Sequence, residues 1–103
     1  MKLTQNQIDS IDETISLDSG KKIIRLDYSG EDSLSKEEHN FNVFCIDDDN
    51  NVIWRIESDS PEKRDSFVSI DLEGDKLTAD RFFGGEYKVE VSTGIAEKVG
   101  WHK

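Results

Sequence analysis

The sequence predicts one mainly β domain over residues 1–103, an antiparallel meander of about eight short strands in a curled sheet or a small barrel. Three observations support this fold. Apolar and polar residues alternate along most of the chain, which is the period of a half-buried strand. Clusters of Gly, Asp, Asn and Ser separate the alternating runs, as tight turns between antiparallel neighbours do. The length of 103 residues suits a single hydrophobic core.

The first two strands are predicted as a hairpin. The odd positions from residue 11 to residue 17 are apolar, apart from Glu13. Residues 18–20, Asp-Ser-Gly, follow as a turn in which Gly accepts a positive φ without steric cost. Residues 21–28, KKIIRLDY, then resume the alternation as the second strand.

A short helix competes with this pattern at the N-terminus. Thr4 and Gln7 have the spacing of a helix capping box, and Leu3 and Ile8 have that of a hydrophobic staple. An isolated helix of this length is marginally stable in water. The sequence therefore leaves open whether residues 5–12 form a helix or a strand.

The middle of the chain predicts a loop and then a central hairpin. Residues 29–40 are polar and charged with one apolar residue, and they are expected to form the longest loop. Residues 40–46 and 51–57 carry apolar side chains on both faces, so this hairpin is expected to be covered from two sides. Residues 58–65 read as a polar connection.

The last third predicts four strands joined by tight turns. The strands are expected at residues 67–72, 77–82, 87–91 and 95–101. The turns are expected at 73–75, at the pair Gly84-Gly85 and at 92–94. In the final strand, Ile95, Val99 and Trp101 occupy odd positions and are expected to share one face.

The run DDDNN offers the alternating oxygen ligands of a calcium loop, at Asp47, Asp49 and Asn51. The sixth position of such a loop is Gly, and here it is the β-branched Val52. We therefore predict no metal site, and a hairpin turn in which Asn50 or Asn51 takes the left-handed conformation.

No other pattern indicates catalysis. His39 and His102 stand apart from any second metal-ligating side chain at suitable spacing. Cys45 is the single cysteine and lies inside an apolar run, where a thiol behaves as a small hydrophobic group. We therefore predict a protein that is not an enzyme and has no cofactor.

The net charge of −10 indicates the kind of partner. It disfavours nucleic acid and anionic membranes, and it favours a basic protein surface. No apolar stretch reaches the length of about 18 residues that a membrane span needs. The N-terminal residues lack the apolar region of a secretion signal, so a cytoplasmic location is expected.

Two segments are alike. Residues 43–54, VFCIDDDNNVIW, and residues 89–101, VEVSTGIAEKVGW, both run from a strand through a turn to a Trp. They resemble the hairpin of quinoprotein-type β-propeller blades, and also small uncharacterised bacterial single-domain proteins with one such hairpin mid-chain and a Thr-Gly hairpin at the end. The resemblance implies strand-turn-strand geometry and no catalytic residues. A propeller needs at least about four blades, so no quinone cofactor is implied.

Three functions follow as hypotheses. The first is a non-enzymatic, immunity- or inhibitor-like interaction module whose acidic residues bind a basic protein: Glu31, Asp32, Glu37, Glu38, Asp47, Asp48 and Asp49. The second is a carrier of a small apolar ligand, with a pocket formed by Tyr28, Phe44, Phe82 and Tyr87. The third is a structural protein that self-associates into an oligomer through an unpaired edge strand.

Overall fold

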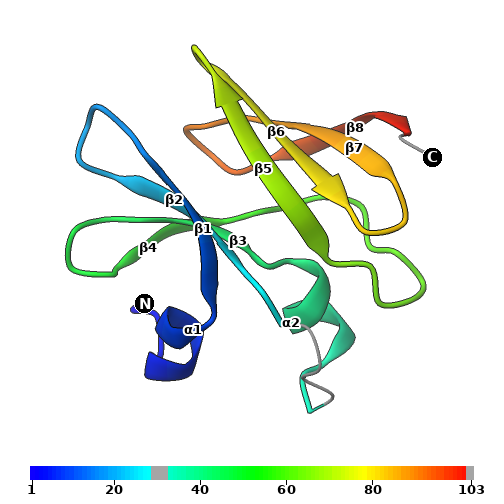
Figure 1. Ribbon diagram of the computed structural model, residues 1–103, viewed down its shortest axis with the longest axis horizontal. Coiled ribbons are helices and arrows are strands. Elements are labelled where there is room, and N and C mark those ends of the chain that lie inside the picture. The colour runs from blue at the N-terminus through cyan, green and yellow to red at the C-terminus, as the bar shows by residue number, and fades with distance from the viewer. Residues whose placement is uncertain (29–32, 102–103) are drawn as a thin grey trace.

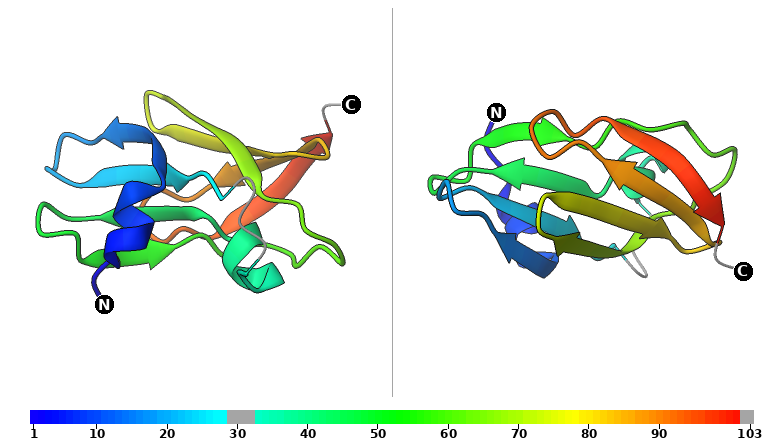
Figure 2. Two further views of the ribbon diagram at one scale, coloured as in Figure 1. Left: turned by 60° about the horizontal axis from the view of Figure 1, so that its bottom comes forward. Right: turned by 90° about the horizontal axis from the view of Figure 1, so that it is seen from above.

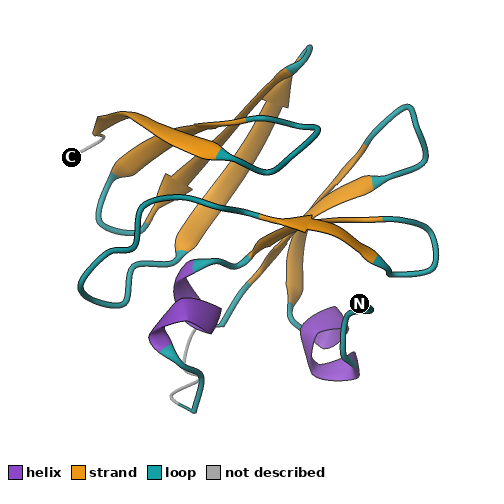
Figure 3. Ribbon diagram, turned by 180° about the vertical axis from the view of Figure 1, so that it is seen from behind, coloured by secondary structure: helices purple, strands orange, loops and turns teal. Residues whose placement is uncertain are grey.

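The computed structural model describes residues 1–28 and 33–101. Eight antiparallel strands form two four-stranded sheets that lie face to face, and two short helices accompany the first sheet (Figures 1 and 3). The strand orders are β1-β2-β3-β4 and β5-β6-β7-β8, so the chain runs as a meander through one sheet and then through the other. The predicted class, strand number and meander are confirmed. The strands divide between two sheets and do not close into a barrel.

The elements have the following bounds. The first sheet contains β1 (Ile11–Ser16), β2 (Lys22–Leu26), β3 (Val43–Ile46) and β4 (Val52–Arg55). The second contains β5 (Phe67–Glu73), β6 (Lys76–Arg81), β7 (Gly85–Val89) and β8 (Ala96–Trp101). The helices are α1 (Gln5–Asp9) and α2 (Lys36–Asn40).

The main core lies between the two sheets. Its buried side chains come from both of them: Ile23, Val43, Cys45, Trp54 and Ile56 on one side, and Phe67, Ile70, Leu77, Ala79, Tyr87 and Val89 on the other. A smaller cluster covers the outer face of the first sheet beneath α1, and contains Leu3, Ile24, Leu26, Phe44 and Ile46. All four residues of β3 are buried, so this strand of the central hairpin is covered from two sides as predicted, whereas Ile53 of β4 is exposed.

The N-terminal helix exists and is short. The Thr4 hydroxyl accepts a hydrogen bond from the Gln7 amide, and the Gln7 side chain accepts one from the Thr4 amide, which completes the capping box. Leu3 and Ile8 both pack on the smaller cluster, as a hydrophobic staple does. The helix ends at Asp9, and β1 begins two residues later, so residues 5–12 contain both structures.

The expected loop at residues 29–40 is wrong in its second half, because α2 forms there. The Ser35 hydroxyl caps this helix by accepting a hydrogen bond from the Glu38 amide, 3.2 Å away. Arg55 of β4 then donates to carbonyl oxygens at and after the C-terminal end, those of Glu37, Glu38 and Phe41. A helix of five residues is not stable alone, so this contact from a distant strand supports it.

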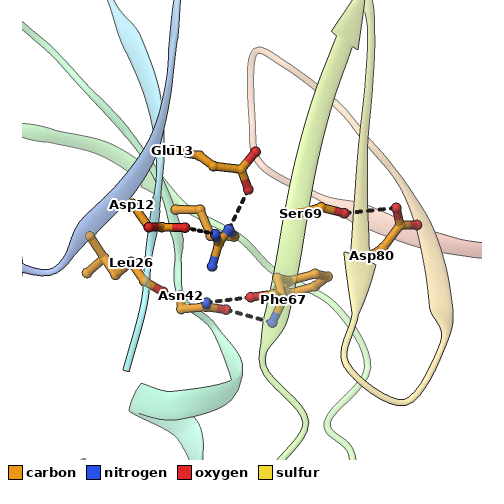
Figure 4. A network of polar contacts seen from close by, with 8 residues as sticks. Asp12, Glu13, Leu26, Asn42, Phe67, Ser69 and Asp80 are labelled. Carbon is orange, nitrogen blue, oxygen red and sulfur yellow. Dashed lines mark hydrogen bonds and ion pairs between the residues drawn. The ribbon is translucent and has the colours of Figure 1, made fainter. Parts of the chain in front are cut away.

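Each of the four edge strands carries one extra, bulged residue, whereas the central pairs β2-β3 and β6-β7 are regular. The extra residues are Asp12, Ile53, Val68 and Val99. The bulge in β1 lets both Asp12 and its neighbour Glu13 pair with the buried Arg25 of β2 (Figure 4). A bulge also bends the strand and interrupts the row of backbone groups at its edge.

The bulge at Val99 overturns one sequence prediction. Ile95, Val99 and Trp101 were expected to share a face, but the extra residue shifts the alternation within β8. All three side chains are more than half exposed. Ile53 and Val68, the apolar bulge residues of β4 and β5, are exposed as well.

Two turns show how backbone conformation follows sequence. Asn50 has a φ of 63°, which confirms the predicted hairpin turn. The predicted Gly84-Gly85 turn is displaced, because Gly85 already belongs to β7 and lies opposite Trp101. The turn uses Phe82, Phe83 and Gly84, and of the two glycines Gly84 has the positive φ, 105°.

Candidate functional site

Buried amides join the two sheets at one end. The Asn42 side chain donates to the carbonyl oxygens of Leu26 at 2.8 Å and Phe67 at 2.9 Å, and it accepts from the Phe67 amide at 2.9 Å (Figure 4). It thus forms the hydrogen bonds with the backbone of β5 that a neighbouring strand would form. Asn40 acts in the same way on the carbonyl of Lys63 and the amide of Asp65.

Arg81 completes this polar end and is 2% exposed. Its five N–H groups face five acceptors: the Tyr87 and Ser58 hydroxyls and the carbonyl oxygens of Asn40, Asp65 and Asp59. The guanidinium also lies 4.1 Å from the centre of the Phe67 ring. Because its donors are all occupied within the protein, Arg81 is a structural group. We name Asn40, Asn42, Asp65, Arg81 and Tyr87 the polar clamp.

Tyr87 couples the clamp to the segment at 58–65. Its hydroxyl donates to an Asp59 carboxylate oxygen, and it accepts from Arg81. Burial raises the pKa of Tyr87 above its ordinary value, and the Asp59 hydrogen bond raises it further. The tyrosine therefore stays neutral and acts as a fixed hydrogen-bonding link.

The predicted acidic residues do not form one patch. Glu37 and Glu38 lie on α2, whereas Asp48 and Asp49 lie at the opposite end of β3, roughly 15 Å away along the strand. Asp47 stabilises the turn, because its Oδ1 atom accepts hydrogen bonds from the Asp49 and Asn51 amides, both at 2.9 Å. Hydrogen bonds from Asn51, and then from Asp49, lower the pKa of Asp47. Glu31 and Asp32 lie outside the described residues.

The four residues of the predicted apolar pocket do not all come together. Phe44 is buried beneath α1, and Tyr87 is buried between the sheets. Phe82 is 65% exposed in the β6–β7 turn. Tyr28 is half-buried at the end of the first sheet. Tyr28 and Phe44 thus belong to one cluster, whereas Phe82 and Tyr87 lie elsewhere. A pattern with a period of two does not show which sheet faces which.

The structure instead forms an acidic cavity of about 540 Å³ beside the two helices. Its walls come from α1 and its flanks, from the chain after β2 and from the beginning of α2: Thr4, Asn6, Gln7, Asp9, Ser10, Asp27, Tyr28, Ser33, Leu34 and Glu38. The charged side chains among these described residues are all carboxylates, those of Asp9, Asp27 and Glu38. The cavity therefore favours a cationic group.

Among the described residues that were predicted to bind a partner, only Glu38 lines this cavity. The sequence held a usable signal for its position, because Ser35 and Glu38 have the same capping spacing as Thr4 and Gln7. The convergence of α1 and α2 had no local signal, since it depends on how both helices pack on the first sheet (Figure 2).

Two further observations concern other kinds of site. Within residues 1–28 and 33–101, no group of three or more His, Cys, Asp or Glu side chains is placed to hold a metal ion. Over the same residues, every helix is too short and too polar to cross a membrane.

The match of this chain to known proteins is to a family model. Neither the curated proteins nor the solved structures gave a match to this sequence. The family model described as "Domain of unknown function (DUF7957)" matches residues 4–101, from the cap of α1 to the end of β8. Since that match spans nearly the whole chain, the protein belongs to the DUF7957 family.

Proposed function

We propose that this chain is a non-enzymatic interaction module that binds a basic protein partner, in the manner of an immunity or inhibitor protein. The observation that carries the proposal is the acidic cavity beside α1 and α2. A concave site with only carboxylates among its charged walls is complementary to an arginine or lysine side chain.

The chemistry of the walls supports a guanidinium or ammonium group in particular. Gln5 donates to Asp9 and Ser35 donates to Glu38. A carboxylate accepts several hydrogen bonds, so Asp9 and Glu38 can also accept from a cation. The half-buried ring of Tyr28 offers an aromatic surface for a cation. Two walls of the cavity belong to α1 and α2, whose N-termini are capped by side-chain hydrogen bonds. The site is therefore largely formed before a partner arrives.

The remaining exposed carboxylates act at longer range. The net charge of −10 attracts a basic partner from a distance, and Glu37, Asp48 and Asp49 add to this field without lining the cavity. We therefore expect association to slow markedly between low and physiological salt, because exposed charges are screened. A salt-independent association rate would contradict this role.

A charge-matched pair of variants tests the cavity itself. The cavity variant carries Asp9→Asn, Asp27→Asn and Glu38→Gln, and the control carries Asp71→Asn, Glu73→Gln and Glu97→Gln at exposed positions of the second sheet. Each set removes three negative charges. Affinity capture from the native host, followed by mass spectrometry, should recover a basic protein with the unmodified chain and the control but not with the cavity variant. Equal recovery by both variants would refute the cavity as the binding site.

A small probe tests the same site without the partner. N-acetyl-arginine amide should shift the NMR signals of Tyr28 and Ser33, whereas the uncharged citrulline counterpart should not. The shifts should disappear in the cavity variant and remain in the control. Equal shifts with citrulline would show that charge is not what the cavity recognises.

A further inference from the structure

A second concave site lies at the end of the sandwich away from the polar clamp. The clamp holds the sheets together near α2, and the sheets separate toward the β1–β2 and β5–β6 turns (Figure 1). A cleft of about 720 Å³ opens there, lined by residues of both sheets and of the β1–β2, β5–β6 and β7–β8 connections. This volume lies within the range of sites that bind small molecules.

The floor of the cleft is apolar and comes from both sheets. Cys45 and Trp54 belong to the first sheet, and burial raises the pKa of the Cys45 thiol, so it is a neutral group there. Leu17, Leu72 and Val91 pack against the same core but are only partly buried. Because apolar surface on this floor stays open to solvent, an apolar ligand that covers it gains free energy.

Two contacts hold the Trp54 side of the floor in place. The Trp54 indole nitrogen donates to the Val91 carbonyl oxygen at 2.7 Å, which ties β4 to the β7–β8 turn. Gly94 passes so close to the indole that a Cβ atom there would lie 2.4 Å from a ring carbon. Trp54 is thus fixed from two directions, so this surface is formed before a ligand arrives, which lowers the entropic cost of binding.

The charged side chains around the cleft do not select an ion. Lys76 and Lys88 are exposed and alternate with buried residues of β6 and β7, so they point to the outer face of the second sheet. Glu90 is likewise exposed and follows the buried Val89. The charged residues among the described lining are three lysines and three carboxylates: Lys21, Lys76, Lys88, Asp18, Asp75 and Glu90. The formal charge of the site is therefore zero.

We propose that this cleft binds a small, uncharged, apolar molecule between the two sheets, in contact with Leu17, Trp54, Leu72 and Val91. An ion would lose hydration on entering and would find no excess of opposite charge in return, whereas an apolar body loses little and covers the floor. The inference goes beyond the binding of a basic protein, because the cleft and the acidic cavity have no described lining residue in common.

A series of alcohols tests whether apolar contact drives binding. Hexanol, octanol and decanol are titrated into a Trp101→Phe background, so that fluorescence reports Trp54 alone. Each should change the Trp54 emission in a saturable way and shift the methyl NMR signals of Leu17, Leu72 and Val91. The dissociation constant should fall about tenfold for every two methylene groups added. No saturable response at these methyls, or an affinity independent of chain length, would overturn the proposal.

Ionic analogues test whether the ligand is uncharged. Octanoate and octylammonium are compared with octanol at physiological salt, where the net charge of −10 is screened. Both ions should bind about tenfold more weakly than octanol, since each loses hydration at a site of zero formal charge. An ion that binds as tightly as octanol would contradict the assignment of an uncharged ligand.

A matched pair of variants then locates the site. Leu72→Gln places a polar side chain on the floor, and Val68→Gln makes the same kind of change on β5 at an exposed position that does not line the cleft. Leu72→Gln should lose about tenfold in affinity for octanol, and Val68→Gln should retain it. Leu17→Gln repeats the test from the first sheet if circular dichroism shows Leu72→Gln to be unfolded. Unchanged affinity in the folded floor variant, or an equal loss in the control, would refute this location.

Discussion

At one end of the sandwich, polar side chains from both sheets hydrogen-bond to one another and exclude solvent; at the other end, apolar side chains from the same sheets stay partly open. At the closed end, the Asn42 side chain donates to the carbonyl oxygen of Phe67, 25 positions away in the sequence. Arg81 donates to the carbonyl oxygen of Asn40, 41 positions away. The open end relies on Trp54 and Leu72, which have less specific partners.

The difference shows that polar and apolar contacts have different roles in this small core. A buried guanidinium is costly unless every donor is met, so the clamp tolerates only one arrangement of the sheets. Apolar contacts are less directional, and the open end can therefore expose part of its floor without losing the fold. Hydrogen bonds set the orientation of the sheets at one end, and a cleft remains between apolar side chains at the other.

The largest test of this comparison removes the centre of the clamp. Arg81→Met should lower the free energy of unfolding by about 3 to 5 kcal/mol, because the Asn40 and Asp65 carbonyl oxygens would stay buried without their donor. Urea unfolding followed by circular dichroism measures the change. Arg64→Met is the matched control, since Arg64 is exposed and donates one side-chain hydrogen bond, to Leu34. A similar cost for both variants would show that burial of Arg81 is not decisive.

The open end is tested by Gly94→Ala against Gly74→Ala. Both glycines have a positive φ, 79° and 63°, so both variants share the backbone strain of a left-handed alanine. A Cβ at Gly94 would strike the Trp54 ring, whereas one at Gly74 meets nothing within 4 Å. We expect Gly94→Ala to cost about 2 kcal/mol more than Gly74→Ala in thermal or urea unfolding. Equal costs would mean that Trp54 moves freely.

A smaller effect is expected in the pH dependence of the stability, to which Tyr87 of the clamp contributes. The folded pKa of Tyr87 is raised above the unfolded value of about 10, so its contribution is complete below about pH 10 and is lost as the pH rises through the folded pKa. Tyr87→Phe should cost about 1 kcal/mol at neutral pH through lost hydrogen bonds. Its stability should also fall less steeply than that of the unmodified protein between about pH 9 and pH 11. Parallel pH curves would contradict the assignment.

The smallest effect concerns the β3–β4 turn at the end of β3 away from the clamp. The folded pKa of Asp47 lies below its unfolded value of about 3.9, so its stabilisation is present above that value and is lost as the pH falls through the folded pKa. Asp47→Asn should therefore weaken the acid dependence of the melting temperature, and Asp48→Asn should not. The same acid dependence in both variants would show that Asp47 is merely a surface charge.

How much the sequence could predict depends on how local each feature is. The turn at Asn50 and the helix capped by Thr4 follow from residues within a few positions. The turn was predicted, and the helix was one of the two alternatives that the sequence left open. The single-residue shift at Val99 has no local signature, so the face of Trp101 was wrong. Alternation alone also indicated one continuous sheet, because it does not show where strand pairing stops.

The candidate sites were less predictable for the same reason. The acidic cavity depends on α2, which Arg55 stabilises from another strand. Among its described lining residues, Glu38 was predicted as a partner-binding residue and Tyr28 as a residue of the apolar pocket. The cleft beside Trp54 and Leu72 lies between the two sheets, so its position depends on contacts between distant segments such as that of Asn42 with Phe67. The grouping of acidic and apolar side chains in space requires contacts between segments far apart in the chain, which a local pattern does not show.

The bulged edge strands bear on how other molecules can approach this protein. Adding a foreign strand to a sheet requires an uninterrupted ladder of amides and carbonyls, and each outermost strand in the described chain breaks that ladder once. We therefore expect copies of the chain to remain separate even when concentrated, which light scattering over a dilution series would reveal. We therefore expect a binding partner to contact the side chains of the helices and turns and not to add a strand to either sheet.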